Sequence, residues 1–177
     1  MSGSVELYPL QTLSQFNEIK LRPFIGTGIG FFHFNPKAHL YNEWFELQPL
    51  HLEGQGFAEY PDRKNYKRTQ IYIPLSLGFK YKITDNYFFS LSTIFRKTFT
   101  DYIDDVSTNY IDPSLFNKYL SRYDAILAKQ LYYRGNNNPA PSSGSIRGYN
   151  SLDSYTSIVF TFTYLFNRSE SYYYHRP

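Results

Sequence analysis

The sequence predicts an all-β fold of antiparallel strands joined in up-and-down order, and three observations predict it. Apolar and polar residues alternate through two adjacent runs within 69–105. The residues between these runs, Thr84-Asp85-Asn86, are typical of a tight turn, because their short polar side chains bond to nearby backbone. Connections between the predicted strands alternate between short and long along the chain. With 177 residues, the chain is expected to form one domain, 1–177.

The first run, 71–83, shows the alternation most clearly. Because successive side chains of a strand point to opposite faces, a period of two gives one apolar and one polar face. A helix would not keep these residues on one side. The apolar positions are Ile71, Ile73, Leu75, Leu77, Phe79, Tyr81 and Ile83. The second run, 87–98, alternates in the same way. A soluble sandwich would carry this signature too, so the hairpin alone leaves the environment open.

Further strands are expected on both sides of this hairpin. Residues 3–11 resemble the end of a strand, 19–35 a long strand and 155–166 a final strand, which gives about five strands. Three glycines share one face within 26–30, where they leave room for large neighbours or mark bends. Aromatic residues and a proline follow them instead of a helix, so a nucleotide-binding loop is not expected.

The lengths of the connections favour a membrane barrel. The short connections are 12–18 and 84–86, and the long ones are 36–68 and 101–153. Bacterial outer-membrane barrels have short periplasmic turns and long extracellular loops. The predicted fold class is therefore an antiparallel up-and-down transmembrane β-barrel, located in the outer membrane.

Composition agrees with strands that have aromatic outer faces and polar inner faces. The chain contains 19 Tyr and 16 Phe, yet its mean hydropathy is -0.47. A net charge of +3 is too small to argue for nucleic acid as a partner. The absence of cysteine excludes disulfides, thiolate metal sites and a cysteine nucleophile. No run approaches the roughly 20 apolar residues of a membrane helix. The alternative is a soluble β-barrel that binds a small molecule with its aromatic face inward.

The first long loop should hold a hairpin and a basic run. The hairpin is expected within 38–50, turning at Tyr41-Asn42-Glu43. The basic run lies just before the strand at 69 and consists of Arg63, Lys64, Lys67 and Arg68. We interpret it as a solvated segment that, beside an outer membrane, lies at headgroup level and contacts lipid phosphates.

The second long loop should hold a helix. Asp112 and Pro113 suit an N-cap and a first helical position, and apolar residues recur at helical spacing through Leu131. This predicts one amphipathic helix that lies over the barrel mouth or packs on its rim. Residues 134–150 are rich in Gly, Pro, Asn and Ser, and a flexible loop is expected there.

Charged residues around the end of the central hairpin suggest ion pairs. Since unpaired charges inside a narrow barrel are costly, the acids of the DYIDD stretch should pair with basic lumen residues and brace the rim. The residues expected in these lumen or rim pairs are Lys80, Lys82, Arg96, Asp101, Asp104 and Asp105. The EF-hand spacing with its central glycine is absent, so no metal site and no cofactor are predicted.

An enzyme is not expected. The four histidines His33, His39, His51 and His175 are scattered without ligand spacing. A hydrolase or acyltransferase at the outer rim could use Asp101, His33 and Ser107, but their spacing gives it no support. No catalytic residue is therefore predicted.

Four segments carry a resemblance to a known family. FHFNPKA (32–38), LQPL with EGQG (47–56), IPLSLGFKY (73–81) and RKTFTDYIDDVST (96–108) resemble the PorG-like outer-membrane β-barrels of Bacteroidetes, the DUF6089 family. The match covers most of the chain, and the last motif is long and unusual. The resemblance implies an eight-stranded barrel associated with the type IX secretion system, and it brings no catalytic residues.

The resemblance also implies partners. These are outer-membrane lipid and the proteins of the periplasmic secretion ring, with the turn Thr84, Asp85 and Asn86 as an expected ring contact. About five strands are visible where the family has eight, and the first residues do not resemble a signal peptide. We therefore expect the chain to lack the signal peptide and about three N-terminal strands.

Overall fold

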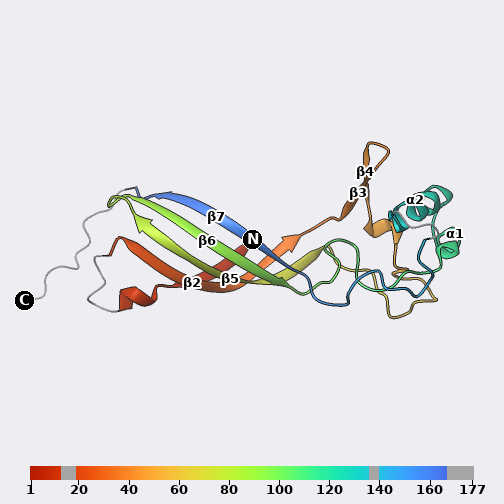
Figure 1. Cartoon of the computed structure of the whole chain (residues 1–177), viewed down its shortest axis with the longest axis horizontal. Coiled ribbons are helices and arrows are strands. Elements are labelled where there is room, and N and C mark those ends of the chain that lie inside the picture. The colour runs from red at the N-terminus through yellow and green to blue at the C-terminus, as the bar shows by residue number, and fades with distance from the viewer. Residues whose placement is uncertain (13–18, 136–139, 167–177) are drawn as a thin grey trace, which may run out of the picture. The chain divides into compact units, whose positions relative to one another are not determined.

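The computed structural model describes residues 1–12, 19–135 and 140–166 (Figure 1). The chain, expected to form one domain, has two compact units. The first, here called the sheet unit, comprises Met1–Gly30, Tyr72–Lys97 and Ser154–Pro177. The second, here called the loop unit, comprises Phe31–Ile71 and Thr98–Asp153.

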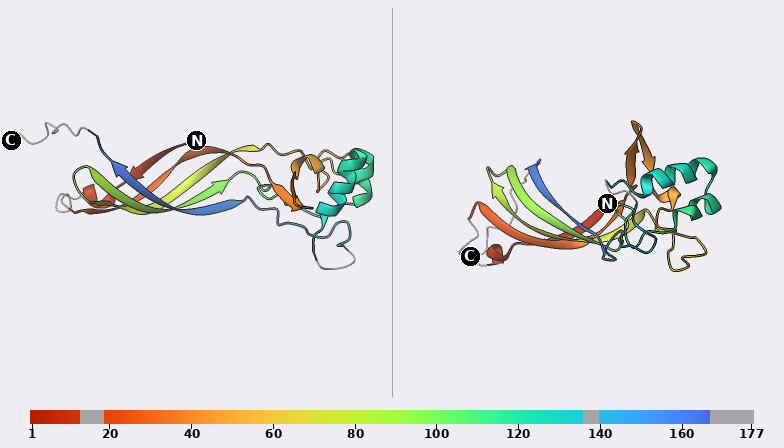
Figure 2. Two further views of the ribbon diagram at one scale, coloured as in Figure 1. Left: turned by 90° about the horizontal axis from the view of Figure 1, so that it is seen from above. Right: turned by 45° about the vertical axis from the view of Figure 1, so that its right-hand side comes forward.

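The sheet unit is built on five strands in the order β1-β2-β5-β6-β7. Their bounds are β1 (Ser2–Leu7), β2 (Leu21–His33), β5 (Thr69–Lys82), β6 (Tyr87–Thr98) and β7 (Ser154–Tyr164). Each strand pairs with the next strand of this sheet along the chain, so the predicted up-and-down order of antiparallel strands is confirmed, and the described chain is mostly β. Figure 2 shows that the sheet is strongly curved. Strands β1 and β7 are its two edges, so the described sheet is open and the expected closed barrel is not found.

The tight turn forms where the sequence predicted it, between β5 and β6. The N–H of Ile83 donates to the carbonyl of Tyr87 at 2.9 Å. The hydroxyl of Thr84 accepts from the N–H groups of Asn86 and Tyr87 at 3.3 and 3.2 Å. Asn86 also reaches the end of β7, because its side chain donates to the carbonyl of Leu165 at 3.0 Å. The turn therefore joins the ends of three strands. Of the other expected short connection, 12–18, residues 13–18 lie outside the described part of the chain.

The glycines of β2 leave room for neighbours, as expected. A Cβ atom at Gly30 would overlap the ring of Tyr72, and one at Gly28 would overlap the backbone of Gly3 on β1. Tyr72 is 8% exposed and lies on the same face as Gly30. The glycine spacing thus allows β1 and β5 to approach β2 closely on this face.

The predicted hairpin of the loop unit is confirmed. It consists of β3 (Lys37–Leu40) and β4 (Glu43–Glu46), which pair antiparallel. Tyr41 and Asn42 form the turn with φ of 48° and 64°. Two consecutive residues with positive φ match the twist of a two-residue hairpin, and asparagine tolerates this conformation better than most residues.

The prediction of a single helix in the second long loop is wrong in one respect, because the segment 116–132 forms two helices. A 3₁₀ turn η4 (Pro113–Leu115) leads into α1 (Phe116–Tyr119), and α2 (Arg122–Tyr132) follows. The side chain of Asp112 accepts from the N–H of Ser114 at 2.9 Å, so the N-cap prediction is confirmed. The extended conformation of Leu120 ends α1, and the Ser121 side chain caps α2 by accepting from Asp124 N–H at 3.1 Å. A serine at this position favours a new N-terminus over continuation of the first helix.

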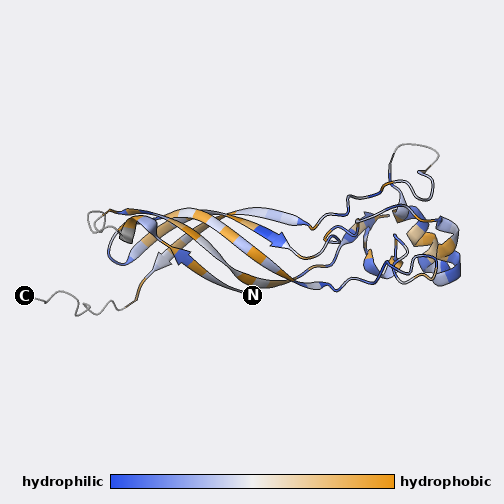
Figure 3. Ribbon diagram, turned by 90° about the horizontal axis from the view of Figure 1, so that it is seen from below, coloured by the Kyte–Doolittle hydropathy of each residue, from blue (hydrophilic) through white to orange (hydrophobic). Residues whose placement is uncertain are grey.

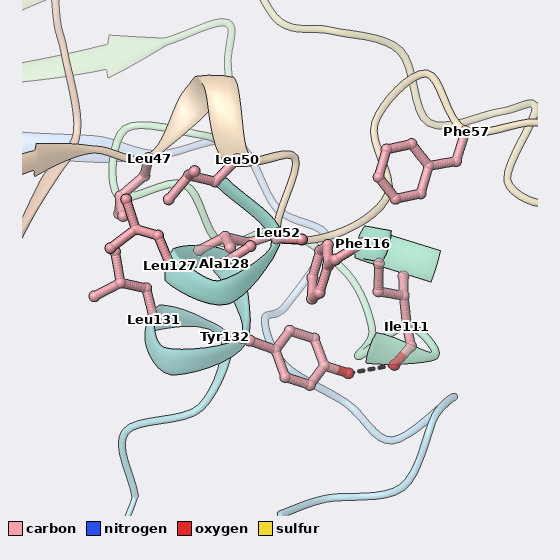
Figure 4. Close-up of a cluster of buried hydrophobic side chains, with 11 residues drawn as sticks. Leu47, Leu50, Leu52, Phe57, Ile111, Phe116, Leu127, Ala128, Leu131 and Tyr132 are labelled. Atoms are coloured by element: carbon pink, nitrogen blue, oxygen red, sulfur yellow. Dashed lines mark hydrogen bonds between the residues drawn. The ribbon is translucent and has the colours of Figure 1, made fainter. Parts of the chain in front are cut away.

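Buried apolar side chains of the loop unit form one core (Figure 4). It joins α1, α2, the 3₁₀ turn η3 (Gln48–Leu50) and residues next to η3 and before α1. Its buried members are Leu47, Leu50, Leu52, Phe57, Ile111, Phe116, Ala125, Leu127, Ala128, Leu131 and Tyr132. Tyr132 keeps its hydroxyl satisfied inside this core by donating to the carbonyl of Ile111. The long loops are thus folded around a core of their own.

The expectation of a flexible loop at 134–150 is wrong for its second half. The N–H groups of Arg147 and Gly148 both donate to the carbonyl of Thr108, at 2.9 and 2.8 Å. Tyr110 donates to the carbonyl of Ser145 at 2.9 Å. Residues 136–139 lie outside the described part. Backbone pairing with 108–110 fixes 144–148, and composition gave no sign of it.

Candidate functional site

The sheet unit exposes its apolar face. Leu75, Leu77 and Phe160 are 51%, 66% and 68% exposed. Figure 3 shows the hydrophobic colour recurring along the strands. Large apolar residues more than one third exposed on these strands include Val5, Leu7, Leu21, Ile25, Ile29, Ile73, Leu75, Leu77, Phe95, Ile158, Phe160 and Phe162. A contiguous exposed apolar surface of this kind marks a site for a protein or membrane partner.

Pairing makes this surface continuous between neighbouring strands. On β6 and β7, Leu91 lies opposite Phe160 and Phe89 opposite Phe162. The rings of Phe89 and Phe160, diagonal neighbours, have centroids 6.4 Å apart. Residues directly opposite in an antiparallel pair share a face of the sheet. The exposed apolar side chains therefore form a band across strands. We call the set of large apolar residues given above the apolar band.

The opposite face of the sheet is polar and more closely packed. A cavity of about 100 Å³ lies on it, lined by the small or polar side chains of Ser2, Ser4, Glu6, Thr27, Ser76, Ser92 and Arg96 together with Phe24, Tyr72, Pro74 and Ile94. Arg96 donates to the hydroxyl of Ser157 at 2.6 Å. Its guanidinium carbon lies 5.8 and 5.3 Å from the ring centroids of Tyr72 and Tyr155. Cation–π contacts of this kind satisfy a partly buried positive charge without a carboxylate.

The predicted lumen bases find partners within the sheet unit. Lys80 donates to the hydroxyl oxygen of Tyr8 at 2.8 Å and lies 3.9 Å from a Glu6 carboxylate oxygen. Lys82 contacts Asp85 at 2.5 Å. These partners belong to β1, to the residues after it and to the tight turn. The expected pairs between these lysines and the DYIDD acids are therefore replaced by local ones.

The DYIDD acids are bound within the loop unit instead. Asp101 accepts from the Ser107 hydroxyl at 2.8 Å and from the N–H of Ser151 at 3.1 Å. Asp104 accepts from the N–H of Val106 at 3.1 Å. These acids shape their own loop, so the expected ion pairs with Lys80, Lys82 and Arg96 are corrected to hydrogen bonds with backbone and hydroxyl groups.

Asp105 is fully buried and has positive φ. Its Oδ1 accepts from the hydroxyl of Tyr66 at 2.7 Å, whereas its buried Oδ2 has no hydrogen-bond partner. Burial raises the pKa of Asp105 to about 6. The charges of Glu53 and Asp104 also raise this pKa, whereas the hydrogen bond from Tyr66 and the charge of Arg147 lower it. Burial and the Asp105 charge also raise the pKa of Tyr66. Asp105 thus destabilises the loop unit when it is ionised.

Glu53 is the centre of a second buried polar network that sequence reasoning missed. Its Oε1 accepts from Ser107 N–H at 3.0 Å, and its Oε2 accepts from the N–H and hydroxyl of Thr108 at 3.0 and 2.9 Å. Arg147 approaches the same carboxylate at 3.4 Å, with both side chains buried. This network joins the segments 47–56 and 96–108, two of the four that carry the family resemblance. A glutamate in irregular chain gives no periodic signal, so its role could not be predicted.

The basic run before β5 divides into two kinds of residue. Arg63 donates to the carbonyl groups of Glu53 and Asn109 at 2.7 and 3.0 Å. Arg68 donates to Gln48 and Glu46 at 2.6 and 2.8 Å. Lys64 and Lys67 are exposed. Two of the four predicted phosphate contacts are therefore arginines that bind within the loop unit, and the two lysines are on the surface.

The residues of the rim-enzyme alternative have structural partners. Ser107 donates to Asp101, and a ring nitrogen of His33 lies 3.1 Å from the hydroxyl of Thr69. Burial lowers the pKa of His51, which packs against Phe57. Across 1–12, 19–135 and 140–166, no group of three or more His, Asp or Glu side chains is placed to hold a metal ion.

Within the part of the chain that the structure describes, no helix is long and apolar enough to cross a lipid bilayer. A scan of family models, a search of curated proteins and a search of solved structures find no match to this chain.

Proposed function

We propose that this chain is a non-enzymatic component of an outer-membrane β-barrel whose apolar band faces lipid. The observation that carries the proposal is the exposure of Leu75, Leu77 and Phe160 on a curved sheet whose polar residues lie on the opposite face. In a water-soluble sheet the apolar face is the one that packs on the core. In a membrane barrel it is the face in contact with hydrocarbon.

The energetics favour a lipid partner for the apolar band. Leaving one large apolar side chain in water instead of burying it forfeits about 1.5–3 kcal/mol. Because these side chains are about half exposed, the summed loss across the band is comparable with the roughly 5–15 kcal/mol of net stability that a domain has. A bilayer removes this loss for every member of the band at once, because each lies on the same face of one continuous sheet.

The proposed barrel needs more strands than the described sheet provides. Strands β1 and β7 are open edges, and unpaired backbone groups cost several kcal/mol each in hydrocarbon. A closed barrel of about eight strands has room inside for side chains or for one small ligand. The proposed barrel is therefore filled rather than a conducting pore, which agrees with the close packing of Tyr72 over Gly30.

We further propose that the barrel contacts the periplasmic ring of the type IX secretion system. This rests on the resemblance of the four segments to PorG-like barrels and on the turn between β5 and β6. The turn is fixed by its own hydrogen bonds, while the Asp85 side chain is 74% exposed. A rigid turn with an exposed charge suits a protein contact.

Fractionation tests the membrane half of the proposal. The full-length protein should sediment with outer membranes, resist extraction by alkaline carbonate and migrate faster on gels before heating than after. A protein that stays soluble and monodisperse without detergent would contradict it and favour the small-molecule-binding alternative.

A charge reversal tests the secretion half. Asp85→Arg leaves the hydrogen bonds of Thr84 and Asn86 in place while inverting the exposed charge of the turn. It should reduce co-purification with the ring proteins, whereas Asp62→Arg, at an exposed acid of the loop unit, should not. Equal recovery of ring proteins with both variants would remove the turn from the proposed contact.

A further inference from the structure

The sheet unit carries an excess of positive charge. Among its described residues there are six Lys or Arg against two carboxylates. The basic residues are Lys20, Arg22, Lys80, Lys82, Arg96 and Lys97. The carboxylates, Glu6 and Asp85, each contact one lysine, so they offset only part of the excess.

Two of these cations line a cavity of about 280 Å³. Its walls are Tyr8, Arg22, Lys80, Phe88, Thr163 and Leu165. Tyr8 directly follows the edge strand β1 and Leu165 directly follows the edge strand β7. The curvature of the sheet therefore brings residues from both edges to a single cavity. Its lining combines a guanidinium and an ammonium with two hydroxyls and two apolar side chains.

One of these two cations, Lys80, also has a carboxylate neighbour, Glu6, which lies outside the lining of the cavity. Lys80 donates to the Tyr8 oxygen at 2.8 Å, and the Tyr8 hydroxyl donates to Glu6 at 2.5 Å. Glu6 lies 3.9 Å from the Lys80 nitrogen and is 40% exposed in its side chain. At this distance and exposure the Glu6–Lys80 ion pair is weak. A ligand anion that binds Lys80 directly would therefore displace the Glu6 carboxylate at little cost.

We propose that this cavity binds an oxyanion, a phosphate or carboxylate group carried on a short apolar chain. Arg22 and Lys80 bind the charged oxygens, since guanidinium and ammonium groups both recognise such oxygens through charge-assisted hydrogen bonds. Phe88 and Leu165 contact the apolar part. The volume lies just below the range of about 300–1,000 Å³ typical of ligand pockets, so the ligand is small. The inference stands independently of the secretion role.

Titration calorimetry of the full chain with butyl phosphate tests the site, in the medium that keeps the protein monodisperse. Butyl phosphate and butyrate should bind saturably, and inorganic phosphate more weakly because it lacks the apolar chain. Butylammonium, which has the same chain and the opposite charge, should not bind. Affinity for butylammonium equal to that for butyl phosphate would overturn the proposal, and so would the absence of saturable butyl phosphate binding.

Three variants locate the site. Arg22→Gln should weaken butyl phosphate binding at least about 10-fold, the effect of losing one hydrogen bond to a charged group. Arg96→Gln removes a cation of the same face outside the cavity and should leave affinity unchanged. Glu6→Gln should raise affinity, because it removes the competing carboxylate. Unchanged affinity in Arg22→Gln, or a loss in Glu6→Gln, would overturn the assignment, and circular dichroism of each variant checks that the fold is kept.

Discussion

The carboxylate of Glu53 binds the main chain and the side chain of Thr108, although 55 residues separate them in sequence. Both bonds are made by a side chain with no exposure to solvent. A buried carboxylate is stable only where donors surround it, and here the donors come from Ser107, Thr108 and Arg147. The loop unit is therefore organised around a charge as well as around its apolar core.

Replacing Glu53 should destabilise the loop unit strongly. Glu53→Gln keeps the size of the side chain but removes its charge, which breaks the buried ion pair with Arg147. Removing one partner of a buried pair costs about 3–5 kcal/mol. Urea unfolding followed by near-ultraviolet circular dichroism, which reports the packed tyrosines, should show this loss. The matched control is Glu59→Gln, a surface carboxylate paired with Lys118 at 2.6 Å, where the loss should be much smaller because exposed ion pairs contribute little. Equal effects of the two variants would contradict the central role of Glu53.

Asp105 should make the loop unit less stable as pH rises. Its pKa of about 6 in the fold lies above the ordinary 3.8, so between these values the folded chain holds a proton that the unfolded chain has lost. The free energy of unfolding therefore falls as pH rises through this window and levels off above it. Asp105→Asn removes the titration, and asparagine tolerates the positive φ of this position.

The difference in unfolding free energy between Asp105→Asn and the natural chain measures this effect directly. It should be smallest near pH 4 and grow in favour of the variant up to about pH 6.5, by at most about 3 kcal/mol for a shift of this size. Asp62→Asn, at an exposed acid, serves as the control and should show a flat difference. A flat profile for Asp105→Asn as well would mean that the buried carboxyl keeps an ordinary pKa.

Gly30 should not tolerate a side chain. A methyl group there would overlap the ring of Tyr72, so Gly30→Ala should cost about 1–3 kcal/mol by overpacking. Gly3→Ala is the control, because a Cβ atom at Gly3 has no neighbour within 4 Å. In a Tyr72→Leu background the cost of Gly30→Ala should shrink, since the ring is gone. Thermal melting of the four variants tests this, and an undiminished cost in that background would refute the contact.

The strands could be predicted because their signal is local. In β5, Leu75 and Leu77 lie two residues apart on one face, and that spacing is visible in the sequence alone. The helix break at Ser121 was missed because the apolar spacing continues across it, and the capping serine was the one available signal. Arg63 and Lys64 are adjacent and chemically alike, yet Arg63 binds the carbonyl groups of Glu53 and Asn109 whereas Lys64 is exposed. Such contacts depend on which loops come together in the fold, and the spacing of residues along the sequence does not indicate this.

The orientation of the sheet is the central claim, and single-cysteine spin labelling tests it most directly. Since the chain has no cysteine, each introduced one is the sole label site. In lipid vesicles, labels at Leu75→Cys, Leu77→Cys and Phe160→Cys should be accessible to oxygen, which concentrates in hydrocarbon, and shielded from a water-soluble nickel complex. Labels at Ser76→Cys and Lys80→Cys should show less oxygen access than their neighbours. Nickel access at Leu75, Leu77 and Phe160 equal to that of an exposed loop position would contradict the account.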